Sequence, residues 1–432
     1  MFPFLLILAY LILVLVRPQE YPALADSGIP LLPIALIGSL VTWVFARDKR
    51  LDAPQYLLVV LFLFATCLSL IISGWSGGAM DWFVNFAPVI VSFVLLANAV
   101  NTRGKTLAVM IVFVASAALM SIHGIDQKAN GLGWTGMPLV DDGRIQYIGI
   151  FSDPNDVGLL LVMSIPMAMY LGSRGGLMGL RRLFWTAAAL LLMYGVYLTN
   201  SRGALIAVIT MAGVYIWLTR GTLLALALAG ISFAGLRFMP TRMGDIDVQE
   251  SSAMGRVDAW YEGIQMFIGH PFFGVGTNRF TEYHHLTAHN SFVLVLAENG
   301  FFGFMIWLAF VVYCFWMMAR ILKHEPEVDL EGLSDAEVDE IAISWRNDRA
   351  LALTLLISLC GFFAASFFLS RSYVILLYLL AALVVAHFAG VRDRFPSVPG
   401  FDLRQDLVRW PVMTVIAIIA LYGVVKLLLA IG

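Results

Sequence analysis

Long apolar stretches alternate with short polar connections along the whole chain. A membrane-spanning helix needs about 20 mostly apolar residues, and fewer where flanking side chains reach the interface. On this criterion the sequence predicts an all-α polytopic membrane protein with about 12–13 transmembrane helices. The thirteen candidate spans lie near 2–16, 30–46, 56–73, 83–100, 106–122, 157–173, 183–199, 203–218, 221–238, 290–320, 350–369, 372–390 and 410–430.

The composition supports a single integral membrane domain over 1–432. Of the 432 residues, 60% are hydrophobic and only 13% are charged, and the mean hydropathy is +0.85. A soluble domain of this size is far more polar. The three cysteines lie in apolar stretches, which argues against a disulfide framework or a thiolate metal site. The stretch at 2–16 lacks a basic segment and a cleavage site, so we expect a retained first helix rather than a signal peptide.

The basic residues predict the orientation of the chain. If the N-terminus is cytoplasmic, most of the 27 Lys and Arg residues fall in cytoplasmic connections, as the positive-inside rule requires. The cytoplasmic loop at 321–349 then contains an acidic stretch at 325–340, which predicts a short solvated helix. Three long segments face outward, 17–29, 123–156 and 239–289.

Some arginines fall on the outer side, where membrane insertion does not favour them: Arg202, Arg242, Arg256, Arg279 and Arg371. Arg202 opens a span in TNSRGALIA, directly after another apolar stretch. Its guanidinium is either an anchor that reaches to the interface or an anion clamp, because the planar fork of donors matches a phosphate group. The small neighbours Ser201 and Gly203 favour the clamp.

The outward segment 239–289 contains a predicted amphipathic helix at 254–268. Its apolar residues recur at helical spacing, which predicts a helix lying flat on the membrane surface. Arg256 falls at the margin of the apolar face. It is either a contact for a lipid-borne phosphate or an incidental basic residue of an interfacial helix. The apolar positions are Val257, Trp260, Tyr261, Ile264, Phe267 and Ile268.

A histidine stands at the outer mouth of the span at 290–320. His289, in TAHNSF, has an ordinary pKa near neutrality and can accept a proton from an attacking hydroxyl. A capping or merely interfacial histidine is the alternative, and metal ligation by His284, His285 and His289 is a third. Glu298, inside the same span, is expected to be paired structurally, because an unpaired carboxylate in a membrane is costly.

The turn FSDPND, at 151–156, precedes another span. Pro154 and the acidic and amide residues around it are typical of a helix start. Capping explains the motif, and lining a site is the alternative interpretation.

These motifs together resemble the O-antigen ligase and polymerase superfamily. The resemblance rests on TNSRGALIA, GRVDAWYEGIQMFIGHPFFGVGTNRF and AHNSFVLVLAENGFFG, which lie within a core region at about 185–320. It implies a GT-C type membrane glycosyltransferase that takes a glycan from undecaprenyl pyrophosphate on the periplasmic side of the bacterial inner membrane. The implied acceptor is the lipid A-core oligosaccharide. Neither a metal nor another cofactor is implied, and no nucleic-acid partner.

The resemblance also assigns residues. His289 matches the essential histidine of the family, Arg256 the arginine of the periplasmic loop, and Arg202 the arginine of the SRG-like turn. One departure concerns topology, because family members usually have twelve spans and a cytoplasmic C-terminus. The stretch at 410–430 is therefore an additional span or a miscount.

The expected reaction needs two phosphates to be held and one sugar hydroxyl to be deprotonated. Arg202 and Arg256 are expected to bind the pyrophosphate, with Arg279 or Arg371 as a further contact, and His289 to act as the base of a single inverting displacement. The alternatives are a Wzy-type O-antigen polymerase, a protein O-oligosaccharyltransferase or a transporter of lipid-linked glycan. A transporter predicts ionisable residues deep in several spans, whereas the charges here concentrate at the outer interface.

Overall fold

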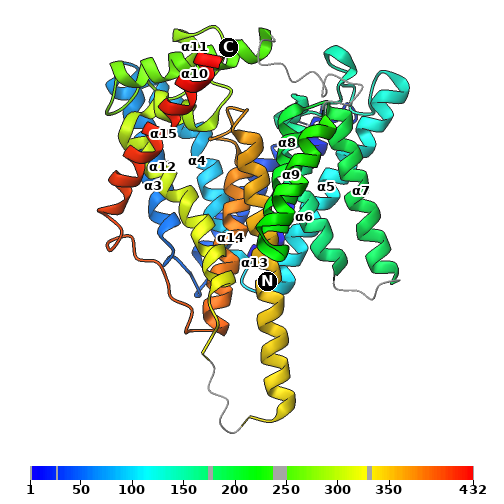
Figure 1. Cartoon of the computed structure of the whole chain (residues 1–432). Coiled ribbons are helices and arrows are strands. Elements are labelled where there is room, and N and C mark those ends of the chain that lie inside the picture. Colours follow the sequence, from blue (N-terminus) through cyan, green and yellow to red (C-terminus); the bar gives the residue numbers. More distant parts are fainter. Residues whose placement is uncertain (1, 26–27, 174–178, 237–250, 328–332, 432) are drawn as a thin grey trace.

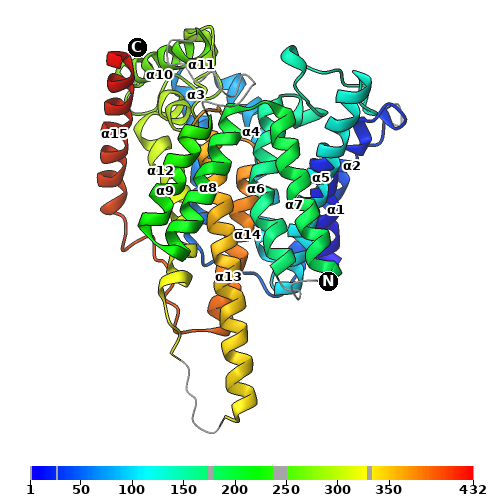
Figure 2. The same cartoon turned by 45° about the vertical axis from the view of Figure 1, so that its right-hand side comes forward.

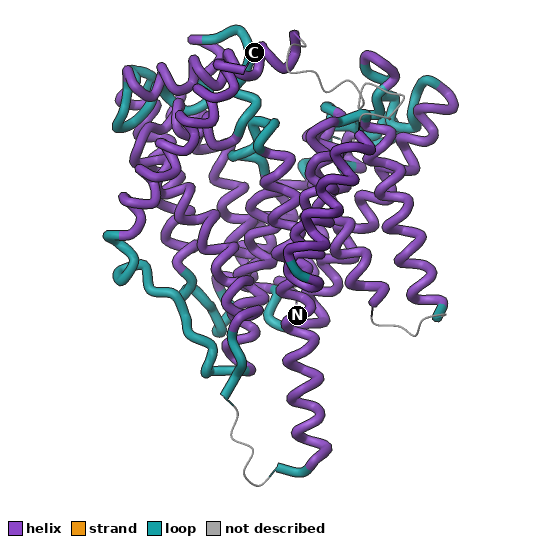
Figure 3. Tube along the Cα trace, viewed as in Figure 1, coloured by secondary structure: helices purple, strands orange, loops and turns teal. Residues whose placement is uncertain are grey.

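Helices make up most of the described chain. The computed structural model describes residues 2–25, 28–173, 179–236, 251–327 and 333–431, and within these ranges it contains helices, turns and two isolated β-bridges (Figure 3). The α-helices are α1 Phe2–Val16, α2 Leu31–Val44, α3 Pro54–Ile72, α4 Ser76–Ala99, α5 Arg103–Asn130, α6 Pro154–Ser173, α7 Leu180–Thr199, α8 Arg202–Arg220, α9 Thr222–Leu236, α10 Ser251–Gly269, α11 Phe280–Tyr283, α12 Ser291–Lys323, α13 Asp335–Ser366, α14 Ile375–Arg394 and α15 Arg409–Ile431.

Each predicted span corresponds to a helix. Within the described residues, 10 helices are long and apolar enough to cross a membrane, and three shorter apolar helices lie at Phe2–Val16, Leu31–Val44 and Thr222–Ser232. The predicted all-α polytopic membrane fold is therefore confirmed. The stretch at 410–430 forms α15, which is one of the 10 candidate spans. Residues 239–250 of the predicted outward segment, with Arg242, lie outside the described residues.

Polar residues at the helix starts explain where several spans begin. The side chains of Thr102, Ser201 and Asn290 accept hydrogen bonds from the first-turn amides of α5, α8 and α12, which otherwise have no partner inside the helix. Pro54 and Pro154 occupy the first positions of α3 and α6, where the absent N–H costs nothing.

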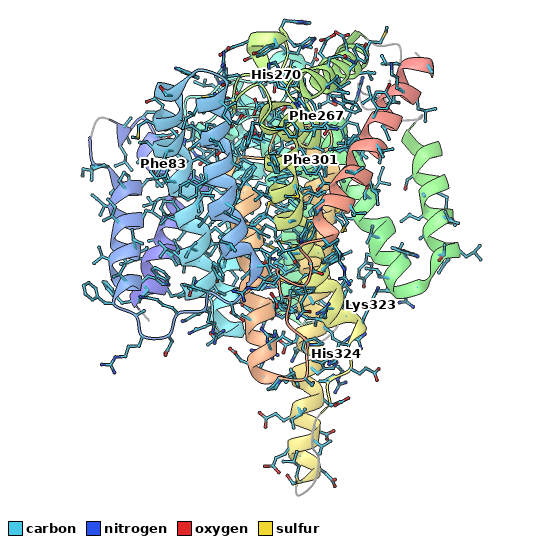
Figure 4. All side chains as sticks on the ribbon, turned by 90° about the vertical axis from the view of Figure 1, so that its left-hand side faces the viewer. Phe83, Phe267, His270, Phe301, Lys323 and His324 are labelled. Carbon is cyan, nitrogen blue, oxygen red and sulfur yellow. The ribbon has the colours of Figure 1, made fainter. Side chains whose placement is uncertain are left out.

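The helices form one bundle with two distinct ends (Figures 1 and 2). We call the end that carries α10 and α11 the α10 end, and the opposite end, from which the first turns of α13 project, the α13 end. The start of α1 lies toward the α13 end and the last turn of α15 at the α10 end. Phe267, His270 and Phe301 lie at the α10 end, and Lys323 and His324 at the other (Figure 4).

Helices α6 and α14 form the centre of the bundle. In an apolar stretch of 18 residues of each helix, 89% of the residues are buried. In the corresponding stretch of α15 only 11% are buried, and this helix lies at the edge of the bundle. Near the α13 end, the fully buried Asp348 of α13 accepts hydrogen bonds from Arg103 at the start of α5 and from Arg394 at the end of α14. A carboxylate that is paired on two sides in this way fixes the three helices relative to one another.

The segment 321–349, predicted as a cytoplasmic loop, is partly helical. Helix α12 continues to Lys323, and α13 begins at Asp335 with a capping box between Ser334 and Glu337. Within the described part of the acidic stretch, residues 325–327 are not helical, and residues 335–340 form the start of the long helix α13 and not a separate short helix. The strong helix start at Ser334 explains the difference, because a capped acidic first turn extends a span beyond its apolar residues.

Helix α10 differs from the prediction in what covers its apolar face. Trp260 is 3% exposed and its ring packs against Phe367, with ring centroids 5.4 Å apart. The helix contacts α12 and α15, and Val425 of α15 belongs to the same hydrophobic cluster. Much of the apolar face of this helix is therefore buried against protein.

Candidate functional site

The segment that carries His289 is fastened to the connection between α13 and α14. Thr287 donates a hydrogen bond to Ser370 (2.9 Å), and the hydroxyl of Ser291 donates to the carbonyl of Leu369 (2.7 Å). The backbone amide of Arg371 donates to the same Ser291 hydroxyl (2.9 Å). These bonds bring Arg371 beside His289, although the two are far apart in the sequence.

His289 itself does not cap the helix that follows it. The side chain of Asn290 accepts hydrogen bonds from the amides of Phe292 (2.9 Å) and Val293 (3.1 Å). His289 has a φ of 46°, a left-handed conformation that few side chains other than Asn, Asp and His adopt readily. The capping interpretation of His289 is therefore wrong, and the imidazole lies outside the α12 ladder of hydrogen bonds.

Positive charge surrounds His289. Burial lowers the pKa of this histidine below 6.5, and the charges of Arg256 and Arg371 lower it further, while Asp153 opposes them. A neutral imidazole can accept a proton, so these surroundings keep His289 in the form that a general base requires. Helix α10 supplies Arg256 and the α13–α14 connection supplies Arg371.

The turn before α6 links these groups together. Arg371 donates through Nε and Nη2 to both carboxylate oxygens of Asp156, with Nη2 at 2.7 Å. Asp153 caps α6 by accepting hydrogen bonds from the amide and the side chain of Asn155 (2.7 and 2.8 Å). The turn at 151–156 thus caps its helix, as predicted, and also orients an arginine next to His289.

Asn155 extends the same network to the start of α8. Its side-chain oxygen accepts hydrogen bonds from Ser201 (2.7 Å) and from Arg144 (3.0 Å), and Arg144 also donates to the carbonyl of Thr199 (2.9 Å). Arg202 is the first residue of α8, directly after Ser201. The start of α8 is thereby tied to the turn that holds Arg371.

Arg279 occupies a different place. Its guanidinium donates to Glu282 (2.6 and 2.8 Å) and to the carbonyl and hydroxyl oxygens of Ser73 at the end of α3 (3.1 Å each). The structure therefore places Arg279 in contacts that fix the loop after α10. Of the five candidate residues, it brings His289, Arg256 and Arg371 together, and it ties Arg202 to them through Ser201 and Asn155.

The histidine pair before His289 makes other contacts. His284 is buried, and its imidazole contacts Asp258 of α10 (3.2 Å) and the carbonyl of Leu286 (3.1 Å). Its ring also lies against His285, with ring centroids 4.4 Å apart. Within the described ranges, no group of three or more His, Cys, Asp or Glu side chains is placed to hold a metal ion.

Helix α12 is interrupted at Gly300, which the sequence did not predict. Gly300 has a φ of 61° and a ψ of −160°, a conformation open to glycine and costly for other residues. The backbone amides of Val275 and Gly276 donate to the carbonyls of Ala297 (3.0 Å) and Glu298 (3.1 Å), which the interruption exposes. The glycine-rich connector at 270–278 therefore replaces hydrogen bonds that the helix lacks.

Glu298 is satisfied by protein groups beside this interruption. It is 2% exposed, and its carboxyl accepts hydrogen bonds from the hydroxyl of Tyr373 (2.8 Å) and the backbone amide of Phe280 (3.3 Å). Asn299 donates to the same Tyr373 hydroxyl (2.6 Å) and accepts from Thr277 (2.8 Å). This network holds the loop that leads from α10 to His289.

The sequence analysis placed the turn with Asp156 at the site only as an alternative interpretation, and it missed Arg144. The available signal was charge complementarity, since Asp156 lies in the first turn of a span and needs a cation of the kind that Arg371 offers at the end of another. Nothing in the local sequence pairs them, because they are separated by 215 positions.

Two family models match the sequence. Residues 187–308 match the model described as O-Antigen ligase, and residues 1–175 match a family of unknown function (DUF5935). No curated protein matches the chain. Arg202, Arg256 and His289 fall in the first matched segment and Asp156 in the second, while Arg371 lies outside both. The site thus combines residues from separately matched parts of the chain.

Proposed function

We propose that this protein is an O-antigen ligase, and the match of residues 187–308 to the O-antigen ligase family model supports the proposal. In this proposal it transfers O-antigen polysaccharide from undecaprenyl pyrophosphate to the lipid A-core oligosaccharide during lipopolysaccharide biosynthesis. The observation that carries the proposal is the grouping of His289 with Arg256 and Arg371 at one end of an apolar bundle. A neutral base among fixed cations suits a reaction in which a hydroxyl attacks and a pyrophosphate departs.

The proposed reaction is one inverting displacement. His289 accepts the proton of the acceptor hydroxyl while its oxygen attacks the anomeric carbon of the donor. The bond from that carbon to the pyrophosphate oxygen breaks, and undecaprenyl pyrophosphate leaves with the electron pair. Arg202 and Arg256 bind the pyrophosphate, and the charge of Arg371, held by Asp156, adds to the positive potential there. The prenyl chain stays among the membrane lipids.

The charges at the two ends support a periplasmic site. Basic residues gather where helices end at the α13 end, among them Arg320 and Lys323 in the last turn of α12 and Arg392 and Arg394 in the last turn of α14. By the positive-inside rule this end is cytoplasmic. The α10 end, with His289, then faces the periplasm of a bacterial inner membrane, where lipid-linked glycans and the lipid A-core meet.

The interrupted helix α12 does not favour a transporter. A transport pathway uses such an interruption to expose backbone groups and ionisable side chains to a passing substrate. Here the connector at 270–278 donates hydrogen bonds to the backbone carbonyls at the interruption, and Tyr373 donates one to the Glu298 carboxyl. Protein groups therefore fill the interruption of α12. We therefore favour an enzyme.

Reconstitution tests the proposal directly. Purified protein in vesicles receives undecaprenyl-pyrophosphate glycan together with lipid A-core, a second lipid-linked glycan or an acceptor protein. We expect transfer to lipid A-core. Preferential transfer to the lipid-linked glycan would identify a polymerase, transfer to protein Ser or Thr an O-oligosaccharyltransferase, and movement of intact donor across the bilayer without transfer a transporter.

The dependence of transfer on pH gives a second prediction. The base form of His289 is lost as the pH falls through its pKa, which lies below 6.5, so kcat/KM should fall only below that pH. Arg256→Gln removes one of the charges that lower this pKa. The pKa of His289 then rises, and the acid limb of the kcat/KM profile should move to higher pH, whatever the change in maximal rate.

The matched control for this profile is Arg279→Gln, since Arg279 is bound to Glu282 and Ser73. This variant should leave the position of the acid limb unchanged. An identical acid limb in wild type and Arg256→Gln would contradict the electrostatic coupling of Arg256 to His289.

A further inference from the structure

Two adjoining cavities lie at the α13 end, far from His289, where the last turns of α12 meet the start of α15. They share Trp316 and Arg409 in their walls. The first has a volume of about 270 Å³ and is lined by Trp316, Ala319, Arg320, Lys323, Phe401, Asp406 and Arg409. The second has a volume of about 430 Å³ and is lined by Trp316, Val408, Arg409, Val412 and Met413. Four charged side chains line the first, which we call the polar cavity, whereas apolar side chains dominate the lining of the second.

The polar cavity carries excess positive charge. Arg320 and Lys323 come from the last turn of α12, and Arg409 is the first residue of α15. The one carboxylate in the lining, Asp406, accepts hydrogen bonds from Tyr313 (2.9 Å) and Arg409 (2.8 Å). Lys323 forms no ion pair with the described residues. The positive end of the α15 dipole adds to the attraction for an anion.

The wall of the polar cavity is ordered by its own contacts. The guanidinium of Arg320 lies 3.9 Å from the ring centre of Phe401 and donates to the carbonyls of Pro399 (3.2 Å) and Gly400 (2.8 Å). Trp316 stacks on Phe401, with ring centroids 6.3 Å apart. A cation that is already held in place loses little freedom when a ligand binds.

Together these features describe a site for an amphipathic anion at a membrane boundary. We propose that one anionic phospholipid binds here, with its phosphate against Arg320, Lys323 and Arg409 and an acyl chain along Val412 and Met413. Basic residues that only anchor a span at the interface need no cavity, whereas a basic cavity joined to an apolar one fits both parts of a lipid. The bound lipid fills the gap between α12 and α15. This inference does not depend on the proposed transfer reaction.

The test measures which lipid the full-length protein retains. Protein in mild detergent is titrated with phosphatidylglycerol or phosphatidylcholine, and bound lipid is counted by native mass spectrometry. The wild type should retain phosphatidylglycerol at least about tenfold more strongly than phosphatidylcholine, since each basic residue near an anionic headgroup contributes about 1 kcal/mol. Retention should weaken as salt is added, because salt screens exposed charges. Equal retention of the two lipids would overturn the proposal.

Variants locate the site. Lys323→Ala combined with Arg409→Gln should weaken retention of phosphatidylglycerol by about tenfold or more, whereas Arg404→Ala, an exposed arginine in the same segment that lines neither cavity, should not. Met413→Trp fills the apolar cavity without changing charge, and it should also weaken retention. If both the double variant and Met413→Trp retain the lipid as the wild type does, the assignment is wrong.

A competition experiment distinguishes a site for a phospholipid from a site for a free anion. Inorganic phosphate is added to the protein loaded with phosphatidylglycerol. Phosphate at millimolar concentration should leave the lipid bound, because it gains nothing from the apolar cavity. Displacement of the lipid by phosphate at the same concentration as by competing phosphatidylglycerol would show a simple anion site and overturn the phospholipid assignment.

Discussion

Replacement of His289 by asparagine is expected to lower the rate of glycan transfer by about 10²- to 10⁴-fold, the acceleration that a positioned general base supplies. Asparagine tolerates the left-handed backbone at this position, where φ is 46°, but it cannot accept a proton. Because Asn290 caps α12, the substitution should leave the helix start intact. Initial rates in the reconstituted system measure the effect, and thermal melting in detergent shows whether the fold is retained.

The neighbouring His285 provides the matched control. It is exposed and lies against His284, so His285→Asn should transfer glycan at close to the wild-type rate. A His289→Asn protein with normal melting behaviour and a rate within about threefold of wild type would rule out His289 as the general base. Loss of activity in both variants would instead point to a structural requirement of the whole segment.

Removal of Asp156 is expected to destabilise the protein by about 3 kcal/mol, the lower end of the cost of breaking a buried ion pair. The Arg371 and Asp156 side chains are 22% and 11% exposed, so Asp156→Ala leaves a poorly solvated guanidinium without its carboxylate. The melting temperature should fall by several degrees. Transfer should also slow, because Arg371 no longer has a fixed position beside His289.

A double variant separates the two roles of this pair. Asp156→Ala with Arg371→Ala removes both charges, so stability should recover part of the loss caused by Asp156→Ala alone. Activity should not recover, since the positive charge beside His289 is gone. Recovery of both stability and transfer in the double variant would show that Arg371 serves the fold and not the reaction. An unchanged melting temperature in Asp156→Ala would show that the pair adds no stability.

The helices could be predicted because membrane insertion constrains the sequence strongly. A span must be apolar over a fixed length and must satisfy its own backbone, so hydropathy locates α3 or α14 without knowledge of their neighbours. The interruption of α12 at Gly300 obeys no such rule. Its exposed carbonyls are satisfied by Val275 and Gly276, which belong to a connector that hydropathy describes only as a loop.

The site could be predicted only in part. His289 and Arg256 carry a local signal, because each stands at a membrane boundary in a recognisable motif. Arg371 was a secondary candidate, and its importance appears only when the bonds of Ser291 to Leu369 and Arg371 place it beside His289. The helical spacing of the apolar residues identified the apolar face of α10 correctly. Such spacing does not show whether lipid or protein covers that face. Contacts between distant segments are what the sequence alone lacks.

Helix α15 has a practical consequence for work with this protein. Its last turn lies at the same end of the bundle as α10 (Figures 1 and 2), and its Lys426 ammonium lies 5.3 Å from the ring centre of Tyr261 in that helix. If the α10 end faces the periplasm and the chain transfers glycan, as proposed, an affinity tag or fluorescent reporter fused behind Ile431 would share a compartment with the bulky glycan substrates and compete with them for space. In the same proposed orientation, a fusion placed before Phe2 would lie on the other side of the bilayer and leave that approach open.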